Sequence, residues 1–344
     1  MSGKSYSEVE LYEKQLLCTE DGQLNRKSIG WSRIPLHTCN LKWNWRRPKR
    51  WNYWCITCKD FLLALGVSDR GFTAVGSLFF LEYEKKHTIS KVGQKILNKN
   101  ITMPDNVYSS VSFEHKDINI FFKQVKEKRG LIIEAESKDG NGKTLKAKIY
   151  IEQPESQETL NVVIPWSNKK FQFTSKQECL PGYGEFSIGK DSYIFEKGST
   201  FATHDFGRGF WPRKTTWNWG AASGYQKNYL IGLNLGGKWT DGTGYNENGY
   251  FIDGKLYKIS EDLDWEYDRN NFMIPWVIKT SCSDNIYLTF KPFFERSSST
   301  NWILYKRSVH QIFGHYKGYI TNSNGEKVQI KDLMGWAEEL TAVW

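Results

Sequence analysis

Short stretches in which apolar and polar residues alternate run through this chain from about residue 50 to its end, and they limit the folds that it can adopt. The segment 111–116 (VSFEHK) is one example, and alternation with a period of two is typical of a half-buried β-strand. Gly, Asn and Asp residues separate the stretches, and Asp253-Gly254 and Asn324-Gly325 are strong signals for hairpin turns. Only residues 330–341 are compatible with a turn or two of helix. The sequence therefore predicts an all-β fold of antiparallel strands with little helix.

Two successive runs of strands resemble each other weakly, which favours two similar units. Trp51-Asn52-Tyr53-Trp54 opens the first run and Trp217-Asn218-Trp219 opens the second, and each is followed by an apolar strand and a Gly-containing turn. A length of 344 residues suits about two domains. We expect an N-terminal extension (1–48) and two antiparallel barrels (49–190 and 191–344), since closed barrels leave no exposed strand edges. The mouth or lumen of such a barrel can hold a small ligand.

The composition excludes several classes of protein. With 15 Trp, 18 Tyr and 20 Phe, the chain is too aromatic to be mainly disordered. A mean hydropathy of −0.58 and the lack of a long apolar run argue against a membrane-spanning helix. Residues 1–14 contain no apolar signal core, so a cytoplasmic protein with reduced thiols is expected. Cys55 and Cys58 form a lone C-x-x-C within a predicted strand, and a structural role is favoured over a redox or zinc site.

The net charge of +9 has one clear focus, which lies just before the first barrel. Five basic residues occur within nine positions, interleaved with Trp43 and Trp45: Lys42, Arg46, Arg47, Lys49 and Arg50. A solvated basic loop is the favoured interpretation. Contact with an acidic ligand or an anionic membrane surface is the main alternative. Basic and aromatic residues together also occur on surfaces that bind single-stranded nucleic acid, but no nucleic-acid motif accompanies the cluster, so no specific nucleic-acid partner is predicted.

Residues 201–276 concentrate the side chains that could carry chemistry. Asp205 and Arg208 would either form a buried ion pair or line a cavity, and Trp217 and Trp219 share one face of a strand, as a core or as a ligand wall. The other candidates in this segment are His204, Trp211, Trp239, Asp241 and Glu247. Asp241 and Glu247 would form an acid–base pair if both pointed inward, although the segment around Asp241 is more typical of a hairpin loop.

Cofactor and nucleophile motifs are missing from the sequence. It contains no G-x-G-x-x-G, G-x-S-x-G or H-E-x-x-H, and its six histidines show no metal-ligand spacing. The sequence therefore predicts neither a metal nor a cofactor.

Several motifs occur in one order along the chain: GWSRIPLHTCNL (30–41), KRWNYWCI (49–56), IPWS (164–167), HDFGRGFWP (204–212), TWNWG (216–220), GLNLGGKWTDGTGYNENGYFIDGKLYKI (232–259) and GWAEE (335–339). Together they resemble the bacterial domain of unknown function 2804 family, from about residue 15 to the end. The family name carries no established reaction, so this resemblance supplies no activity.

Three motifs also suggest more distant relatives. RWNYW (50–54) is similar to an aromatic strand that opens a first barrel, HDFG (204–207) to a strand that joins two barrels, and Trp217–Trp219 to a W-x-W strand that opens a second barrel. These features resemble tandem lipocalin-like proteins such as carotenoid hydratases and tocopherol cyclases. The resemblance implies two lipocalin-like barrels, an apolar cavity and non-redox chemistry on a lipid or isoprenoid. Arg50 replaces the opening Glu of those proteins, and Asn234 is the nearest polar group where the hydratases have an acidic residue.

Three functional hypotheses follow. The first is a protein that binds an apolar small molecule and carries out acid-catalysed hydration, cyclisation or isomerisation if it is an enzyme, with Asp205 and His204 as proton donors and Arg208 as anion holder. The tryptophans, together with Asn234, Asp241 and Glu247, would complete its ligand site. The second is a carbohydrate-active protein with a carboxylate pair drawn from Asp241, Glu247 and Glu338. The third is an interaction module that uses the basic cluster.

Overall fold

The computed structural model describes residues 4–42, 47–96, 101–125, 127, 129–301 and 306–343, and antiparallel β-strands make up most of them. The one helical element in these ranges is the 3-10 turn η1 (Arg26–Ser28), which Asn25 caps by accepting a hydrogen bond from the Lys27 amide. A small parallel pair, β1 (Gln15–Leu16) with β3 (His37–Thr38), lies in the N-terminal segment. The prediction of an all-β chain with little helix is confirmed. In the described part of the chain, no helix has the length and apolar character needed to cross a bilayer.

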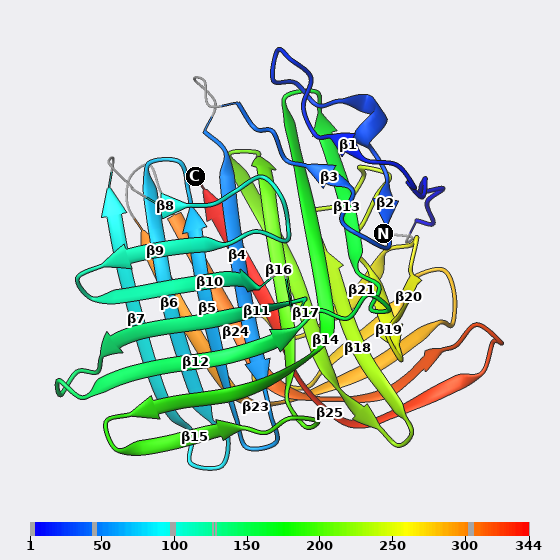
Figure 1. Cartoon of the computed structure of the whole chain (residues 1–344). Helices are drawn as coiled ribbons and strands as arrows, with labels where there is room; N and C mark the ends of the chain where they lie inside the picture. Colours follow the sequence, from blue (N-terminus) through cyan, green and yellow to red (C-terminus); the bar gives the residue numbers. More distant parts are fainter. Residues whose placement is uncertain are drawn as a thin grey trace.

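The first sheet contains fourteen strands and bends back on itself (Figure 1). The first part of its longest strand, β14 (Lys170–Ile188), pairs with β16 (Phe201–Phe210) and the second part with β12 (Thr144–Glu152). The strands β9–β12 (residues 111–152) therefore cross over β4–β7 (residues 49–96). The other strands are β2 (Trp31–Ser32), β4 (Lys49–Thr57), β5 (Phe61–Asp69), β6 (Thr73–Glu82), β7 (His87–Ile96), β8 (Ile101–Thr102), β9 (Val111–His115), β10 (Ile118–Val125), β11 (Gly130–Lys138), β12 (Thr144–Glu152), β13 (Leu160–Ser167), β15 (Asp191–Phe195) and β16 (Phe201–Phe210).

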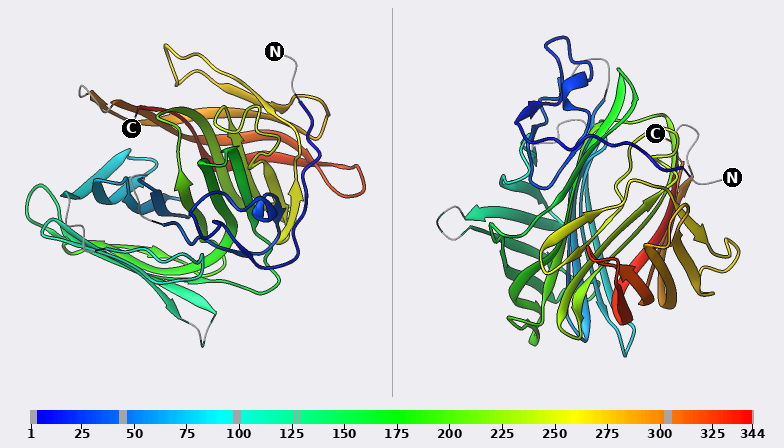
Figure 2. Two further views of the ribbon diagram at one scale, coloured as in Figure 1. Left: turned by 90° about the horizontal axis from the view of Figure 1, so that it is seen from above. Right: turned by 90° about the vertical axis from the view of Figure 1, so that its right-hand side faces the viewer.

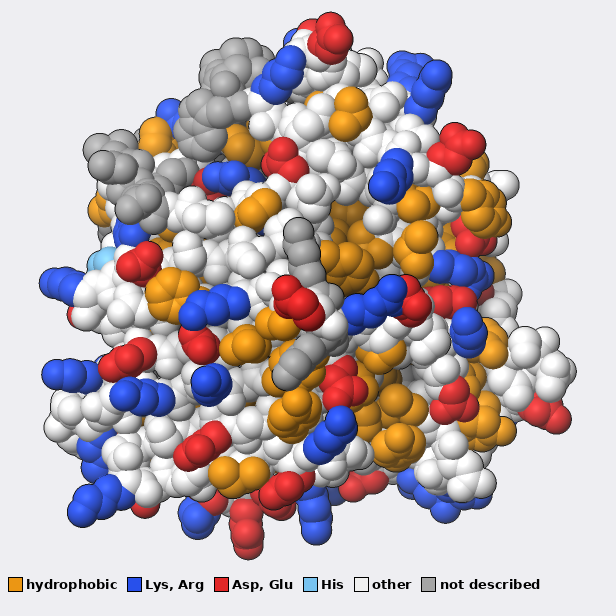
Figure 3. All heavy atoms as spheres, viewed as in Figure 1, with side chains coloured by type: hydrophobic (Ala, Val, Ile, Leu, Met, Phe, Trp, Pro, Cys, Tyr) orange, Lys and Arg blue, Asp and Glu red, His pale blue; other side chains and the backbone are white. Residues whose placement is uncertain are grey.

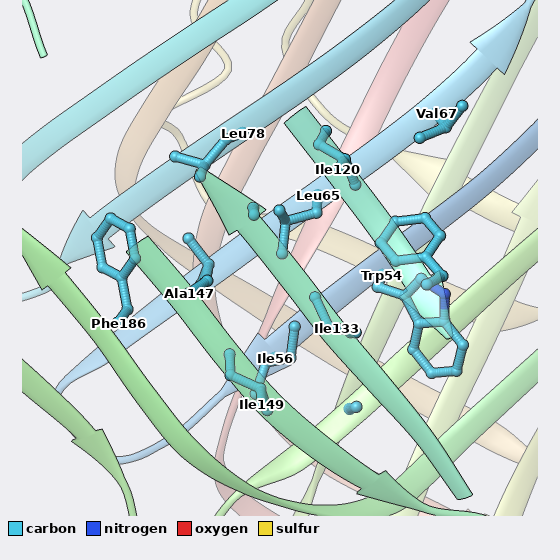
Figure 4. Packing of buried hydrophobic residues seen from close by; sticks show 14 of the residues in the cluster. Trp54, Ile56, Leu65, Val67, Leu78, Ile120, Ile133, Ala147, Ile149 and Phe186 are labelled. Carbon is cyan, nitrogen blue, oxygen red and sulfur yellow. The ribbon is translucent and has the colours of Figure 1, made fainter. Parts of the chain in front are cut away.

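Apolar side chains fill the space between the two halves of this sheet (Figure 4). Trp54 and Ile56 from β4 and Leu65 from β5 pack against Ile133 from β11 and Ile149 from β12. Gly76 lies where β6 meets the facing half, and a Cβ atom there would lie 2.4 Å from the Phe113 ring, so this close approach requires a glycine. The interior of the first half-barrel is therefore a packed core.

The second sheet contains nine strands and curls around a core of its own that includes Trp276 and Tyr316. Its order is β20-β19-β18-β17-β25-β24-β23-β22-β21. The strands are β17 (Lys214–Gln226), β18 (Tyr229–Gly237), β19 (Gly249–Ile252), β20 (Lys255–Lys258), β21 (Leu263–Glu266), β22 (Trp276–Thr280), β23 (Ile286–Asn301), β24 (Lys306–Thr321) and β25 (Lys327–Val343).

The two sheets separate later in the chain than the sequence suggested. Strands β15 and β16 follow residue 190 but belong to the first sheet, and the second sheet begins with β17. The reason is that β16 pairs along most of its length with both β14 and β4, which fixes it in the middle of the first sheet. A division at residue 190 therefore falls within the first sheet.

The sheets pack together through the faces that point away from their own cores. The two views in Figure 2 show three layers, with β4–β7 between β9–β12 on one side and β23–β25 on the other. Phe79 of β6 stacks on Phe313 of β24 with ring centroids 5.7 Å apart, and Tyr53 of β4 meets Trp219 of β17 edge to face at 5.8 Å. Strands in this middle region are thus buried on both faces.

Candidate functional site

A cavity of about 860 Å³ lies between the two sheets rather than inside either half-barrel. Strand alternation explains its first wall, because Trp54 and Ile56 of β4 point into the barrel core whereas Trp51 and Tyr53 point into the cavity. Small and polar side chains on β5–β7, such as Ser77, leave the room that bulkier residues would fill. The opposite wall comes from β17 and β23–β25. The expectation of a ligand space in a barrel mouth or lumen therefore does not describe this cavity.

The inner end of the cavity holds a buried group of three charges. Lys176 of β14 and Asp205 of β16 are cross-strand partners, and Lys176 Nζ lies 3.0 Å from Asp205 Oδ1. Glu247, which precedes β19, places Oε2 at 3.2 Å from the same nitrogen. Gly236 makes this approach possible, since a Cβ atom at that position would lie 2.5 Å from Glu247 Cγ. One ammonium thus serves two carboxylates.

Four tryptophans surround this charged group: Trp211, Trp217, Trp219 and Trp239. Trp211 stacks on Trp239 with centroids 5.2 Å apart, and Lys176 Nζ lies 4.3 Å from the centroid of Trp219. Each indole N–H donates to a fixed acceptor. Trp211 donates to Gln172 Oε1 at 2.6 Å, and Trp217 donates to Glu338 Oε1 at 2.9 Å. Trp219 donates to Asn234 Oδ1 at 2.9 Å, and Trp239 donates to Glu247 Oε1 at 2.8 Å. With their N–H groups engaged, the tryptophans offer a ligand only the apolar ring surface that their neighbours leave uncovered.

Burial changes the proton affinity of the carboxyl groups in the cavity. Desolvation raises the pKa of Glu338, and the hydrogen bond from Trp217 opposes that rise only in part. Desolvation also raises the pKa of Glu247, although Lys176 acts in the opposite direction. For Lys176 burial alone would lower the pKa, but Asp205 and Glu247 outweigh it and raise the pKa. Proton donors and acceptors thus stand next to each other beside aromatic walls.

The structure separates the residues predicted from the sequence into two groups. Those that line the cavity are Asp205, Trp211, Trp217, Trp219, Trp239, Glu247 and Glu338. His204 and Arg208 lie on the opposite face of β16, because residues at odd and even positions of a strand point to opposite sides.

His204 stacks on Trp54 at 4.0 Å, and burial lowers its pKa to about 3. This environment keeps the imidazole neutral and away from the cavity, so the proposed role of His204 as a proton donor there is not supported by its position. Arg208 donates to the carbonyl oxygens of Trp51 and Gly207 and to Asn52 Oδ1, which makes it a structural support of this part of the sheet.

Asn234 and Asp241 lie near the site without lining it. Asn234 is fully buried, accepts from Trp219 and donates to the Glu247 carbonyl oxygen, so it orients two residues of the cavity. Asp241 lies in an exposed turn, where partial burial and the neighbouring Asp262 raise its pKa. It therefore does not form the acid–base pair with Glu247 that the sequence suggested.

Lys176 is the main residue of the site that the sequence analysis missed. It stands in an alternating strand, which predicts a solvated lysine, and its partners lie far away in the sequence. Arg296 was missed for the same reason. Its guanidinium lies 4.1 Å from the Phe79 centroid in the cavity wall, and burial lowers its pKa.

The basic cluster of residues 42–50 is partly engaged in internal contacts. Arg50 pairs with Asp69 at 2.6 Å, Lys49 lines the cavity, Arg47 packs over Phe72 at 2.9 Å, and Lys42 donates to the Glu20 carbonyl oxygen. Arg46 lies outside the described residues. On the face shown in Figure 3, acidic and basic side chains are interspersed. Contact with an anionic membrane surface remains a prediction.

Cysteine and metal chemistry gain no support from the geometry. Cys55 is buried, which raises its pKa to about 12, and burial also raises the pKa of Cys58. Across the described ranges, no three side chains of His, Cys, Asp or Glu converge in a way that could hold a metal ion.

Comparisons with known proteins give a family and several distant structural neighbours, of which two are described here. Kievitone hydratase from Nectria haematococca has 11% sequence identity and a TM-score of 0.49, over 87% of this chain and 89% of that chain. A "putative AttH" from Nitrosomonas europaea has 8% identity and a TM-score of 0.41, over 87% of this chain and 93% of that chain. No curated protein matches this chain. The model of the family described as Domain of unknown function (DUF2804) matches residues 8–344, which is nearly the whole length, and the chain belongs to this family.

Proposed function

We propose that the protein binds an apolar small molecule of the lipid or isoprenoid type in the inter-sheet cavity and transfers protons to and from it without redox chemistry. The observation that carries this proposal is a set of buried carboxyl groups, two with a raised pKa, at the inner end of a tryptophan-walled cavity of about 860 Å³. That volume lies within the range of small-molecule sites, which combine apolar walls with a few fixed polar groups.

Glu338 is the best candidate for the proton donor. To protonate a carbon–carbon double bond, a carboxyl group must keep its proton near neutral pH, which requires a dry site that raises its pKa. Burial shifts the pKa of Glu338 upward, in the direction that this condition requires, and the Trp217 N–H fixes the orientation of the carboxyl group. Asp205 was the donor predicted from the sequence, but its Oδ1 lies 3.0 Å from Lys176 Nζ, and this ion pair suits the role of proton acceptor better than that of donor.

The tryptophans would stabilise the intermediate of such a reaction. Protonation of an alkene by Glu338 produces a carbocation, and the π faces of tryptophan attract cations. Lys176 already occupies this kind of position over Trp219. The cation would be quenched by water, whose proton passes to a carboxylate such as Asp205, or by loss of a neighbouring proton. Hydration and isomerisation both balance without an oxidant.

The test starts from the compound that the native protein carries. Purified protein is extracted with organic solvent, and the extract is analysed by mass spectrometry. We expect one dominant lipid or isoprenoid in the wild-type extract. It should be lost in Ser77→Phe, which fills the cavity, and kept in Ser187→Phe, a matched half-buried serine on the far side of the first sheet. A bound glycan would instead favour the carbohydrate hypothesis, and equal loading of both variants would contradict binding in this cavity.

The chemical step has a separate test. Once the compound is identified, Glu338→Gln should still bind it but lose turnover, because an amide accepts the Trp217 hydrogen bond without supplying an acidic proton. Asp241→Asn is the matched control, since Asp241 lies outside the cavity, and it should behave as the wild type. Full turnover by Glu338→Gln would exclude Glu338 as the acid.

A further inference from the structure

A second group of reactive side chains lies on the other face of β23–β25, at the mouth of the second half-barrel. Ser308 and His310 are two residues apart on β24, so their side chains share one face, and Glu295 reaches them from β23. His310 Nδ1 lies 2.7 Å from Glu295 Oε1, and His310 Nε2 lies 3.3 Å from Ser308 Oγ. A carboxylate, an imidazole and a hydroxyl thus form a continuous chain.

The contacts of the imidazole define its proton positions. A carboxylate can only accept, so Glu295 selects the tautomer that carries the proton on Nδ1, and Nε2 then presents its lone pair to the Ser308 hydroxyl. Phe272 stacks on the ring of His310 with centroids 4.3 Å apart and an angle of 23°, which holds the imidazole plane. This is the arrangement in which histidine activates a serine nucleophile.

A cavity of about 490 Å³ adjoins these three residues and offers space for a substrate. Its cation is Arg269, whose Nε and Nη2 bind Glu339 Oε1 at 3.1 and 2.8 Å. Burial would raise the pKa of Glu339, but hydrogen bonds from Arg269, Lys238 and Tyr267 outweigh it and lower the pKa to about 2. Glu339 therefore stays ionised and anchors the guanidinium of Arg269, which borders the same cavity as Ser308.

This cavity is distinct from the inter-sheet cavity, although Glu295 borders both. Ser308 and His310 line the new cavity, whereas Val309 and Gln311 line the inter-sheet cavity. The alternation of the strand therefore gives the two faces of one sheet different chemistry.

We propose that Ser308, His310 and Glu295 form a nucleophilic centre that hydrolyses small carboxylic esters. Ser308 Oγ attacks the ester carbonyl carbon while its proton passes to His310 Nε2. The bond to the alcohol oxygen breaks, and the alcohol leaves with that proton. Water, deprotonated by His310, then cleaves the acyl-serine to release the carboxylic acid and restore the hydroxyl. The other explanation of the same contacts is a static ion pair that only ties β23 to β24.

A fluorophosphonate probe separates these explanations, because it bonds covalently to an activated serine and releases fluoride. The full-length protein is treated with the probe, and intact-mass measurement and peptide mapping locate the adduct. We expect one adduct on Ser308, none in Ser308→Ala, and unchanged labelling in Ser299→Ala. Ser299 is the matched control, since it is the exposed cross-strand partner of Ser308 and lies outside both cavities.

Hydrolysis of p-nitrophenyl acetate gives a second measurement. His310→Gln should lower the rate about 100-fold or more, the contribution typical of a general base, and Glu295→Gln should also slow it. Asp241→Asn, which lies outside both cavities, should change neither labelling nor rate, and neither assay requires a compound in the inter-sheet cavity, which keeps this test independent of the proposed function. Lack of an adduct on Ser308, or hydrolysis by Ser308→Ala at the wild-type rate in a variant that melts like the wild type, would overturn the proposal.

Discussion

The Lys176 ammonium lies 3.0 Å from the Asp205 carboxylate, between neighbouring strands of the first sheet that bury both side chains. Glu247 approaches the same ammonium from the segment before β19, at 3.2 Å. A single cation thus balances carboxylates from both sheets. Removing charges from water costs several kcal/mol per ion, which only close pairing offsets.

Lys176→Met should therefore destabilise the protein strongly. The substitution keeps most of the volume but leaves Asp205 and Glu247 buried without their cation, and breaking a buried pair in this way typically costs about 3–5 kcal/mol. Urea denaturation at neutral pH measures the free energy of unfolding. Lys279→Met is the control, because its pair with Glu266 is exposed and should contribute little. Similar midpoints for the two variants would contradict a buried charge cluster.

Glu338→Gln should stabilise the protein increasingly as the pH rises. A carboxyl group whose pKa is raised by burial favours the folded state only while it is protonated. The wild type therefore loses stability as the pH rises from 4.5, the ordinary pKa of this group, through the higher pKa that it has in the folded protein. Glutamine does not ionise and escapes this loss, which is about 1.4 kcal/mol for each unit by which the pKa is raised. Urea denaturation of both proteins at several pH values gives the difference.

Glu339→Gln provides a control of opposite sign on the neighbouring residue. The pKa of Glu339 is lowered to about 2, so its ionised form stabilises the fold above 4.5 and that contribution is lost as the pH falls towards 2. The Glu339 variant should therefore be less stable than the wild type by a constant amount above pH 4.5. A slope of the same sign in both variants would contradict the opposite environments of the two carboxyl groups.

His204→Phe should make the protein more resistant to acid. The pKa of His204 is lowered from 6.5 to about 3, so between these values the unfolded chain binds a proton that the folded protein excludes, and the wild type loses stability as the pH falls. Phenylalanine cannot bind the proton and can keep the stacking on Trp54. The stability advantage of the variant should grow from pH 6.5 down to about 3. A difference that is independent of pH would show that this imidazole is not held neutral.

Thiol titration should find one fast-reacting cysteine in the native protein. Cys282 is exposed, whereas Cys18, Cys39, Cys55 and Cys179 are buried. Cys58 is half-buried, and its raised pKa lowers the fraction of reactive thiolate. Ellman's reagent should release about one equivalent quickly in the wild type, none in Cys282→Ser, and six in the unfolded wild type. Rapid loss of two thiols to a Cys55–Cys58 disulfide under mild oxidation would contradict their structural role.

Alternation along a single strand predicts which side chains share a face, and local sequence information predicts no more than that. It placed Trp217 and Trp219 on one face, and both line the cavity. The same rule separates Asp205 from His204 and Arg208, which the sequence analysis grouped by proximity in the chain. The two-residue spacing of Ser308 and His310 can also be read from the sequence, but it matches no known motif. The sequence does not show that Glu295 contacts His310 across the hairpin.

The sequence by itself determined most of the strands, the turns and the side-chain sets on each strand, because these depend on neighbours one or two residues away. Residues 330–341, for which a turn or two of helix was considered, instead lie in strand β25. Only the tertiary structure decided which set faces a cavity. Every residue of β16 is buried, since one face meets the core of the first half-barrel and the N-terminal segment and the other meets the second sheet, so hydrophobicity cannot distinguish the two faces. Lys176, Asp205 and Glu247 become one site only when the sheets pack together, because their attraction acts over a few ångströms between segments far apart in the chain.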